Sequence, residues 1–230
     1  MQLTDGSIYD IAPGAPGERI LLLMLPGAKN TPQQLLDYGF IRALRERSLA
    51  VDVLVLDAHV DLYLERANIE KLLHQTLDEV RAHGYQRIWL LGISLGGTGA
   101  MLCATQRSTE IEGLLLLAPF LGTRGIIAEV EAAGGLHLWQ AGEIASRDYE
   151  RALLEQLKCS PPGTAGFPHI FLGYGREDHY RGASIMLSAY LPEQRVSVIP
   201  GGHDWETWVV LWQKLLDQQP FAWSAQNTSV

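Results

Sequence analysis

The sequence contains little lysine and no long apolar segment. Only four of its 230 residues are lysine, and the formal net charge is -8. Nucleic acids and anionic membranes select for clustered positive charge, so we expect neither as a partner. Apolar runs are short, as in Ile20 to Pro26, and fall far below the roughly 18 residues that cross a bilayer. The start MQLTDGSIYD has neither a basic patch nor an apolar signal core. We therefore expect a soluble, cytoplasmic protein.

Cysteine and metal-binding patterns are also scarce. Cys103 and Cys159 are too few for a disulfide framework, and Cys103 stands among small apolar residues like an ordinary buried thiol. The seven histidines form no H-x-x-x-H pattern, and the sequence has no C-x-x-C. We expect no metal site and no cofactor.

Six short apolar segments have the composition of β-strands. Most are apolar on successive residues rather than alternating, as expected where helices cover both faces of a parallel sheet. The segments are 19–25, 51–58, 87–93, 112–120, 168–175 and 195–202.

Stretches with helical spacing lie between these segments. Residues 30–47 offer Thr31 as N-cap, with Gln34 where a capping box takes Glu or Gln. A second helix is expected between Asn68 and Gly84, because its apolar residues fall on one face. Further helices are expected at about 95–107, 182–191 and 206–216.

Alternating strands and helices predict an α/β fold with a mainly parallel sheet. Right-handed crossovers bring the carboxyl ends of the strands to one edge, where ligands bind. The length suits one sizeable core, so residues 1–230 are expected to form a single domain. Residues 121–167 are longer than one crossover needs and are interpreted as a lid or as a decorated crossover.

The stretch WLLGISLGGTGAML, residues 89–102, places a serine between a strand and a helix. It does not bind phosphate as a P-loop does, because Thr98 and Gly99 stand where Lys and Ser or Thr are required. Instead, Gly92, Ser94 and Gly96 spell G-x-S-x-G in the context of a nucleophile elbow. The alternative is a glycine-rich loop with an incidental serine.

A serine nucleophile needs a base and a carboxylate that orients the base. His203 follows the last expected strand, and Asp178 follows the strand before it. Ser94, Asp178 and His203 therefore occur in the order serine, acid, histidine, each just beyond the end of a strand. Glu177 and Asp204 are alternative acids. His179 is a less suitable base because it adjoins the acid.

The oxyanion formed in such a reaction needs two backbone N–H donors. One is expected at Leu95, at the start of a helix whose dipole favours negative charge. The other is expected at Ala28, in the loop LPGAKNTP after the first parallel strand.

The motifs GISLGG (92–97), GREDH (175–179) and GGHDW (201–205) occur in this order, and the chain resembles the α/β-hydrolase superfamily from about Arg19 to Leu216. The resemblance implies a Ser-acid-His triad at Ser94, Asp178 and His203 and acyl transfer on esters or thioesters. One departure is Pro26-Gly27, where many members have His-Gly after the strand.

These patterns together predict a serine carboxylesterase that cleaves a small ester through an acyl-enzyme intermediate. The alternatives are a thioesterase acting on acyl-CoA or acyl-carrier protein and a non-catalytic binding protein of the same fold. The sequence does not indicate an oligomeric state. The candidate pocket residues, which have lid packing as their other interpretation, are His59, Leu136, Leu138 and Trp139.

Overall fold

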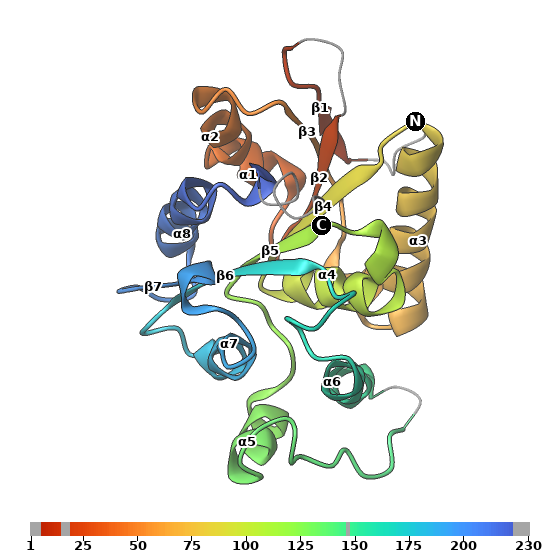
Figure 1. Cartoon of the computed structure of the whole chain (residues 1–230), viewed down its shortest axis with the longest axis vertical. Helices are drawn as coiled ribbons and strands as arrows, with labels where there is room; N and C mark the ends of the chain where they lie inside the picture. Colours follow the sequence, from red (N-terminus) through yellow and green to blue (C-terminus); the bar gives the residue numbers. More distant parts are fainter. Residues whose placement is uncertain (1–5, 15–18, 146–147, 223–230) are drawn as a thin grey trace.

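A mainly parallel sheet forms the centre of the molecule (Figure 1). The computed structural model describes residues 6–14, 19–145 and 148–222. Within these residues, seven strands pair in the order β1-β3-β2-β4-β5-β6-β7. The strands are β1 (Ile8–Asp10), β2 (Ile20–Leu25), β3 (Val51–Val55), β4 (Arg87–Ile93), β5 (Gly113–Leu117), β6 (His169–Gly175) and β7 (Val196–Ile199).

All strand pairs except one are parallel. β1 runs antiparallel to β3, and each later pair is parallel. The six strands from β2 to β7 fall within the six segments expected from the sequence. The short β1 was not expected, because its three residues are only partly buried and carry no apolar run.

Helices cover both faces of the sheet, as Figure 1 shows. Alternate residues of β2 point to opposite sides, so Leu21 and Leu23 join one apolar core while Leu22 and Met24 join the other. One core packs beneath α1 (Pro32–Asp37), α2 (Phe40–Glu46) and α8 (Trp205–Asp217). The other packs beneath α3 (Arg66–Ala82), α4 (Leu95–Gln106), α5 (Arg124–Ala132), α6 (Tyr149–Cys159) and α7 (Arg181–Ser188).

Two helices differ from the sequence expectation. The stretch 30–47 forms α1 and α2 rather than one helix, because Gly39 adopts a left-handed φ of 81° between them. The capping box of Thr31 and Gln34 is present at the start of α1. The helix α3 begins at Arg66, two residues before the expected boundary at Asn68.

Residues 121–167, expected to be a lid insertion or a decorated crossover and called the insertion below, contribute α5 and α6. The helix α6 contacts α4 and buries Leu153, Leu154 and Leu157, whereas α5 contacts α7. Figure 1 shows α5 beyond α6 and α7, at the greatest distance from the sheet. Four short 3-10 turns complete the described chain at Val60–Tyr63, Ser108–Glu110, Glu193–Arg195 and Pro220–Ala222.

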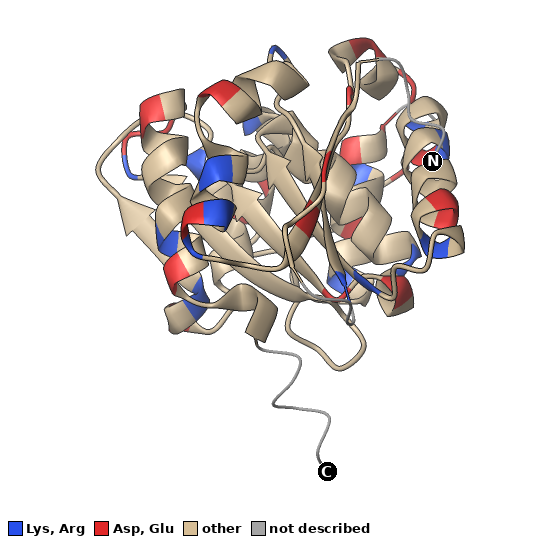
Figure 2. Cartoon of the chain, turned by 90° about the horizontal axis from the view of Figure 1, so that it is seen from above, with Lys and Arg blue, Asp and Glu red and all other residues tan. Residues whose placement is uncertain are grey.

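No helix in the described part of the chain is long and apolar enough to cross a membrane. Acidic and basic side chains are interspersed over the helices and loops (Figure 2).

Candidate active site

Ser94 occupies the turn between β4 and α4 with φ 51° and ψ -116°, a conformation that side chains rarely adopt. Backbone hydrogen bonds to the neighbouring chain hold the turn in place. Ser94 N–H donates to the Leu117 carbonyl at 3.0 Å, and Phe120 N–H donates to the Ser94 carbonyl at 2.9 Å. The serine is therefore fixed at the carboxyl edge of the sheet in the strained geometry of a nucleophile elbow.

Two glycines make room for this turn. A Cβ on Gly92 would lie 2.6 Å from the carbonyl oxygen of Gly96. A Cβ on Gly96 would lie only 2.1 Å from the carbonyl oxygen of Leu25. Neither position tolerates a side chain, so the spacing G-x-S-x-G follows from the close approach of strand and helix.

The side chains of Ser94, Asp178 and His203 form one hydrogen-bonded chain. His203 Nδ1 lies 2.7 Å from Asp178 Oδ2, and His203 Nε2 lies 2.8 Å from Ser94 Oγ. An imidazole that donates its Nδ1–H to the carboxylate leaves the Nε2 lone pair to accept from the serine hydroxyl. The structure thus brings together three residues that are far apart in the sequence.

Asp178 is 1% exposed, so its carboxylate depends on protein partners. Its Oδ2 faces His203, and its Oδ1 accepts from Tyr180 N–H at 2.7 Å. Each carboxylate oxygen therefore has a partner that fixes its direction.

The loops that carry the acid and the histidine are joined directly. Glu177 N–H donates to the Gly201 carbonyl at 3.0 Å, and Gly201 N–H donates to Glu177 Oε2 at 2.5 Å. These two bonds join the loop after β6 to the loop after β7 and set the spacing between Asp178 and His203. The carboxylate of Glu177, one of the two acids that could have replaced Asp178 on sequence grounds, makes this connecting contact.

Aromatic rings surround the imidazole of His203, whose side chain is 11% exposed. The ring of Tyr180 stands edge-on at 5.0 Å between centroids, and that of Trp208 does so at 5.1 Å. Packing on two sides restricts rotation of the imidazole. Sequence reasoning missed Tyr180 and Trp208, although both lie within five residues of Asp178 or His203 and are aromatic.

The remaining candidate acid, Asp204, and the remaining candidate base, His179, do not make the contacts that Asp178 and His203 make. Asp204 is the N-cap of α8, and hydrogen bonds from Thr207 lower the pKa of its carboxyl group. His179 is exposed, and its ring centroid lies 5.7 Å from that of His203. Within the described chain, no hydrogen bond joins His179 to Asp178.

The two expected oxyanion donors belong to segments that adjoin the nucleophile. Leu95 is the first residue of α4, where an N–H has no partner within the helix. Gly27 packs against Ser94, since a Cβ on Gly27 would lie 3.4 Å from the Ser94 Cβ, and Ala28 follows it. Within the described residues, neither the Leu95 N–H nor the Ala28 N–H donates a hydrogen bond. Both donors are therefore available to a ligand.

The candidate pocket residues divide into two groups. Leu136 and Trp139 belong to residues 121–167 and are buried in one of the two apolar cores, and the guanidinium carbon of Arg151 lies 5.7 Å from the centroid of the Trp139 ring. Leu138 is 59% exposed, and His59 caps the turn Val60–Tyr63 through Asp61 N–H. No hydrogen bond, ion pair or ring contact among the described residues joins these four to the Ser94–His203–Asp178 chain, so their place in a pocket stays a prediction.

No group of three or more His, Cys, Asp or Glu side chains in the described ranges could hold a metal ion. Tyr63, which sequence reasoning also missed, carries a buried hydroxyl without a hydrogen-bond partner among the described atoms, close to Gly99 of α4.

Several solved structures share this architecture at low identity. Est1E from Butyrivibrio proteoclasticus is 19% identical with a TM-score of 0.64, and the match covers 94% of each chain. An S-formylglutathione hydrolase from Agrobacterium tumefaciens is 14% identical with a TM-score of 0.62, covering 96% of this chain and 92% of that chain. The fluorophosphonate-binding serine hydrolase F of Staphylococcus aureus is 15% identical with a TM-score of 0.60, covering 94% of this chain and 86% of that chain.

These likenesses, together with the strand order, show that the chain has the α/β-hydrolase fold. The predicted α/β-hydrolase fold, with a mainly parallel sheet and helices on both faces, is thereby confirmed, and the lid stays a prediction. No family model matches the chain, and no curated protein matches it in sequence.

Proposed function

We propose that the protein is a serine esterase that cleaves small carboxylic esters through an acyl-enzyme intermediate. Ser94 Oγ attacks the ester carbonyl while His203 Nε2 takes the hydroxyl proton. His203 then passes this proton to the departing alcohol, and Asp178 stabilises the imidazolium. Water activated by the same histidine releases the acid and restores Ser94.

The observation that carries the proposal is the unbroken chain of hydrogen bonds from Ser94 Oγ through His203 to Asp178, at 2.8 and 2.7 Å. A serine hydroxyl is a weak nucleophile without a base, and this arrangement supplies one that is oriented by a buried carboxylate. The strained turn presents that hydroxyl at the start of α4, whose dipole favours the developing negative charge.

The two available N–H groups support the same chemistry. The Leu95 and Ala28 N–H groups would bind the oxyanion of the tetrahedral intermediate. Such a donor is typically worth about 3 to 4 kcal/mol of transition-state stabilisation. The solved structures of similar fold include hydrolases and lipolytic enzymes, which favours ester hydrolysis over other uses of the fold.

The test uses purified protein and a short p-nitrophenyl ester. Wild type should hydrolyse the ester, and Ser94→Ala should lower kcat/KM by roughly 10⁴-fold or more. Circular dichroism checks that the variant folds. A fluorophosphonate probe should label wild type and leave Ser94→Ala unlabelled. Equal ester turnover by the two proteins would contradict the proposal.

A thioester substrate is the second candidate, because the name S-formylglutathione denotes an acyl group carried on sulfur. The same triad would act on such a substrate. Turnover of acyl-CoA or acyl-carrier protein, compared with oxygen esters of the same acyl chain, distinguishes the two. A higher kcat/KM for the thioester would favour this candidate.

A non-catalytic binding protein of this fold gives a different result in the same experiment. Such a protein would be folded, inactive on esters and thioesters, and unlabelled by the fluorophosphonate.

A further inference from the structure

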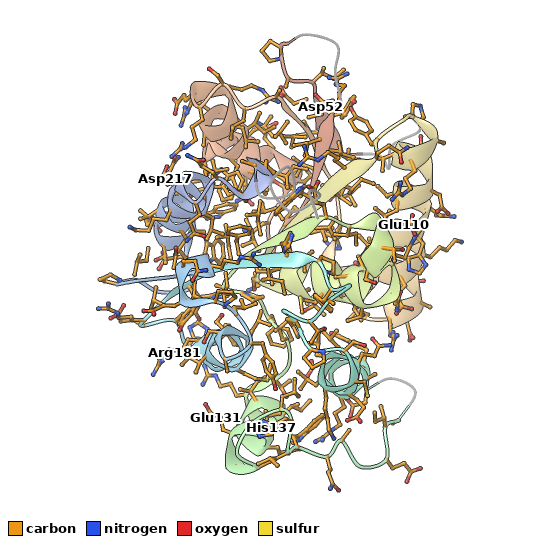
Figure 3. All side chains as sticks on the ribbon, viewed as in Figure 1. Asp52, Glu110, Glu131, His137, Arg181 and Asp217 are labelled. Carbon is orange, nitrogen blue, oxygen red and sulfur yellow. The ribbon has the colours of Figure 1, made fainter. Side chains whose placement is uncertain are left out.

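A hollow of about 170 Å³ lies between α5 and α7, beside the candidate active site. Its α5 side is formed by residues spaced along one helix face, and its α7 side begins at the loop that carries Asp178. Figure 3 shows Glu131 on α5 and Arg181 on the neighbouring α7. The lining residues that the argument uses are Arg124, Glu131, His179 and Tyr180.

Among the described residues, Arg124 has no anionic side chain paired with it. Its side chain is exposed, and no ion pair joins it to another residue in the described ranges. Arg151 of the same insertion differs, because it pairs with Glu129 at 2.7 Å and with Asp148 at 3.2 Å. The guanidinium carbon of Arg124 instead lies 5.7 Å from the centroid of the Tyr180 ring, which directs the charge toward the acid loop.

Tyr180 connects this cation to the reacting groups. Its ring lies 5.0 Å from that of His203, so the Arg124 guanidinium is at most about 11 Å from the imidazole centroid. His203 must hand its proton to the departing alcohol, and this alcohol therefore leaves beside the imidazole. The cation of the hollow therefore lies within about 11 Å of the ring beside which the alcohol departs.

The charges within the hollow are separated. Arg124 and Glu131 share one face of α5, but they are separated by a rise of seven positions, which corresponds to roughly 10 Å along the helix. The cationic end is the one that faces Tyr180 and His203. An anionic group near the reacting ester would thus meet Arg124 before Glu131.

We propose that Arg124 is a specificity-determining residue that binds an anionic group, such as a carboxylate or phosphate, on the leaving alcohol of the substrate. This inference rests on the proposed esterase function. The inference narrows the substrate class from small esters in general to esters whose alcohol or phenol part carries an anionic group. Guanidinium groups suit this role because their paired donors match carboxylate and phosphate oxygens.

Two acetate esters of equal size test the proposal. 4-Acetoxybenzoate carries an anion on its leaving group, and 4-acetoxybenzamide is the neutral match. Wild type should prefer the anionic ester. Arg124→Gln should lower kcat/KM for 4-acetoxybenzoate about tenfold, mainly through KM. It should leave kcat/KM for the neutral ester 4-acetoxybenzamide unchanged. Arg124→Lys should restore part of the preference because it restores the charge.

Glu131→Gln is the matched control, because it alters the same hollow and removes the opposite charge. It should leave the turnover of the anionic ester unchanged or raise it. If Glu131→Gln loses as much kcat/KM for the anionic ester as Arg124→Gln does, the inference is overturned. Equal losses of kcat/KM for both esters in Arg124→Gln would also overturn it, as would a wild-type preference for the neutral ester.

Failure of the esterase function looks different. If wild type cleaves neither ester and no fluorophosphonate labels Ser94, the proposed function itself is wrong. If wild type cleaves both and Arg124→Gln does not alter their ratio, only the role of Arg124 is wrong.

Discussion

At the scale of single residues, the strained backbone of Ser94 is held in place by its neighbours. Its N–H donates to the carbonyl of Leu117, the last residue of β5, and its carbonyl accepts from Phe120 N–H in the segment that follows. Within this segment Ala118 also has a positive φ, of 46°, and its N–H bonds to the Gly173 carbonyl. Hydrogen bonds across β4, β5 and β6 thus hold both strained residues in place, so the folded sheet offsets the local cost.

Tyr63 offers a test of a buried hydroxyl without a partner. Burial raises the pKa of this group, and no hydrogen-bond partner lies among the described atoms. Removing an unsatisfied polar atom removes a desolvation cost, so Tyr63→Phe should leave the free energy of unfolding unchanged or raise it by about 1 kcal/mol. Urea denaturation measures the difference.

The control for this prediction is Tyr85→Phe. Tyr85 is also buried, but its hydroxyl donates to the buried carboxylate of Asp52 at 2.5 Å. Losing this bond should destabilise the protein by about 1.5 to 3 kcal/mol. Equal losses in the two variants would show that the Tyr63 hydroxyl has a stabilising partner.

The sequence allows the three residues of the hydrogen-bonded chain to be predicted, because each lies within four residues of the end of an apolar strand and occurs in the expected order. It does not allow the surroundings of His203 to be predicted. Tyr180 and Trp208 reach the imidazole through packing between α7, α8 and their loops, and no spacing in the sequence indicates such contacts.

At the scale of elements, the start of α8 fixes the position of the residue before it. Asp204 is the N-cap, and its carboxylate accepts from Thr207 N–H at 2.9 Å. His203 immediately precedes this cap, so the direction in which the loop enters the helix also sets the position of the imidazole.

Asp204→Ala should destabilise the protein by about 1 kcal/mol, because it removes the cap, whereas Asp204→Asn should retain most of the stability. The hydrogen bonds from Thr207 lower the pKa of Asp204 in the folded state. Its charge therefore stabilises the fold above the unfolded-state pKa, and this contribution is lost as the pH falls through the folded-state value.

Thermal unfolding, measured between neutral and acidic pH, checks both the stability of the Asp204 variants and its loss on acidification. Asp204→Asn should lose less stability than wild type on acidification, since it has no carboxylate to protonate at this position. A steeper acid loss in Asp204→Asn than in wild type would contradict the assignment.

Elements with long apolar or periodic patterns are predictable, and elements set by local geometry are not. The six parallel strands could be predicted because continuous apolar runs need burial on both sides of the sheet, and α4 because a nucleophile elbow leads from a strand into a helix. The separation of α1 from α2 depends on the left-handed conformation of Gly39, which a glycine in a helical pattern permits but does not require.

At the scale of the whole molecule, the sheet separates two apolar cores that together bury most of the large apolar side chains of the described residues. The helix α4 lies in one of these cores and carries Ser94 at its start and Cys103 near its end. The geometry of the candidate site is therefore tied to the integrity of this core.

The reactivity of the two cysteine thiols measures whether the core around α4 is closed. Cys103 is buried, and burial raises the pKa of its thiol to about 12, so it is neither accessible nor ionised near neutral pH. Cys159 is exposed. Iodoacetamide at pH 8 should therefore modify one thiol in the native protein and two in urea, as counted by mass spectrometry.

The variant Cys159→Ser isolates the buried thiol. Its native form should resist modification, and the slow reaction that remains should accelerate with urea, because alkylation of Cys103 requires the core around α4 to open. The cysteine thiols of Ser94→Ala should be alkylated at the wild-type rate if this substitution removes only the nucleophile. Rapid native labelling of Cys103 in Cys159→Ser would show that α4 is not packed as described, and the fixed geometry of Ser94 would lose its structural basis.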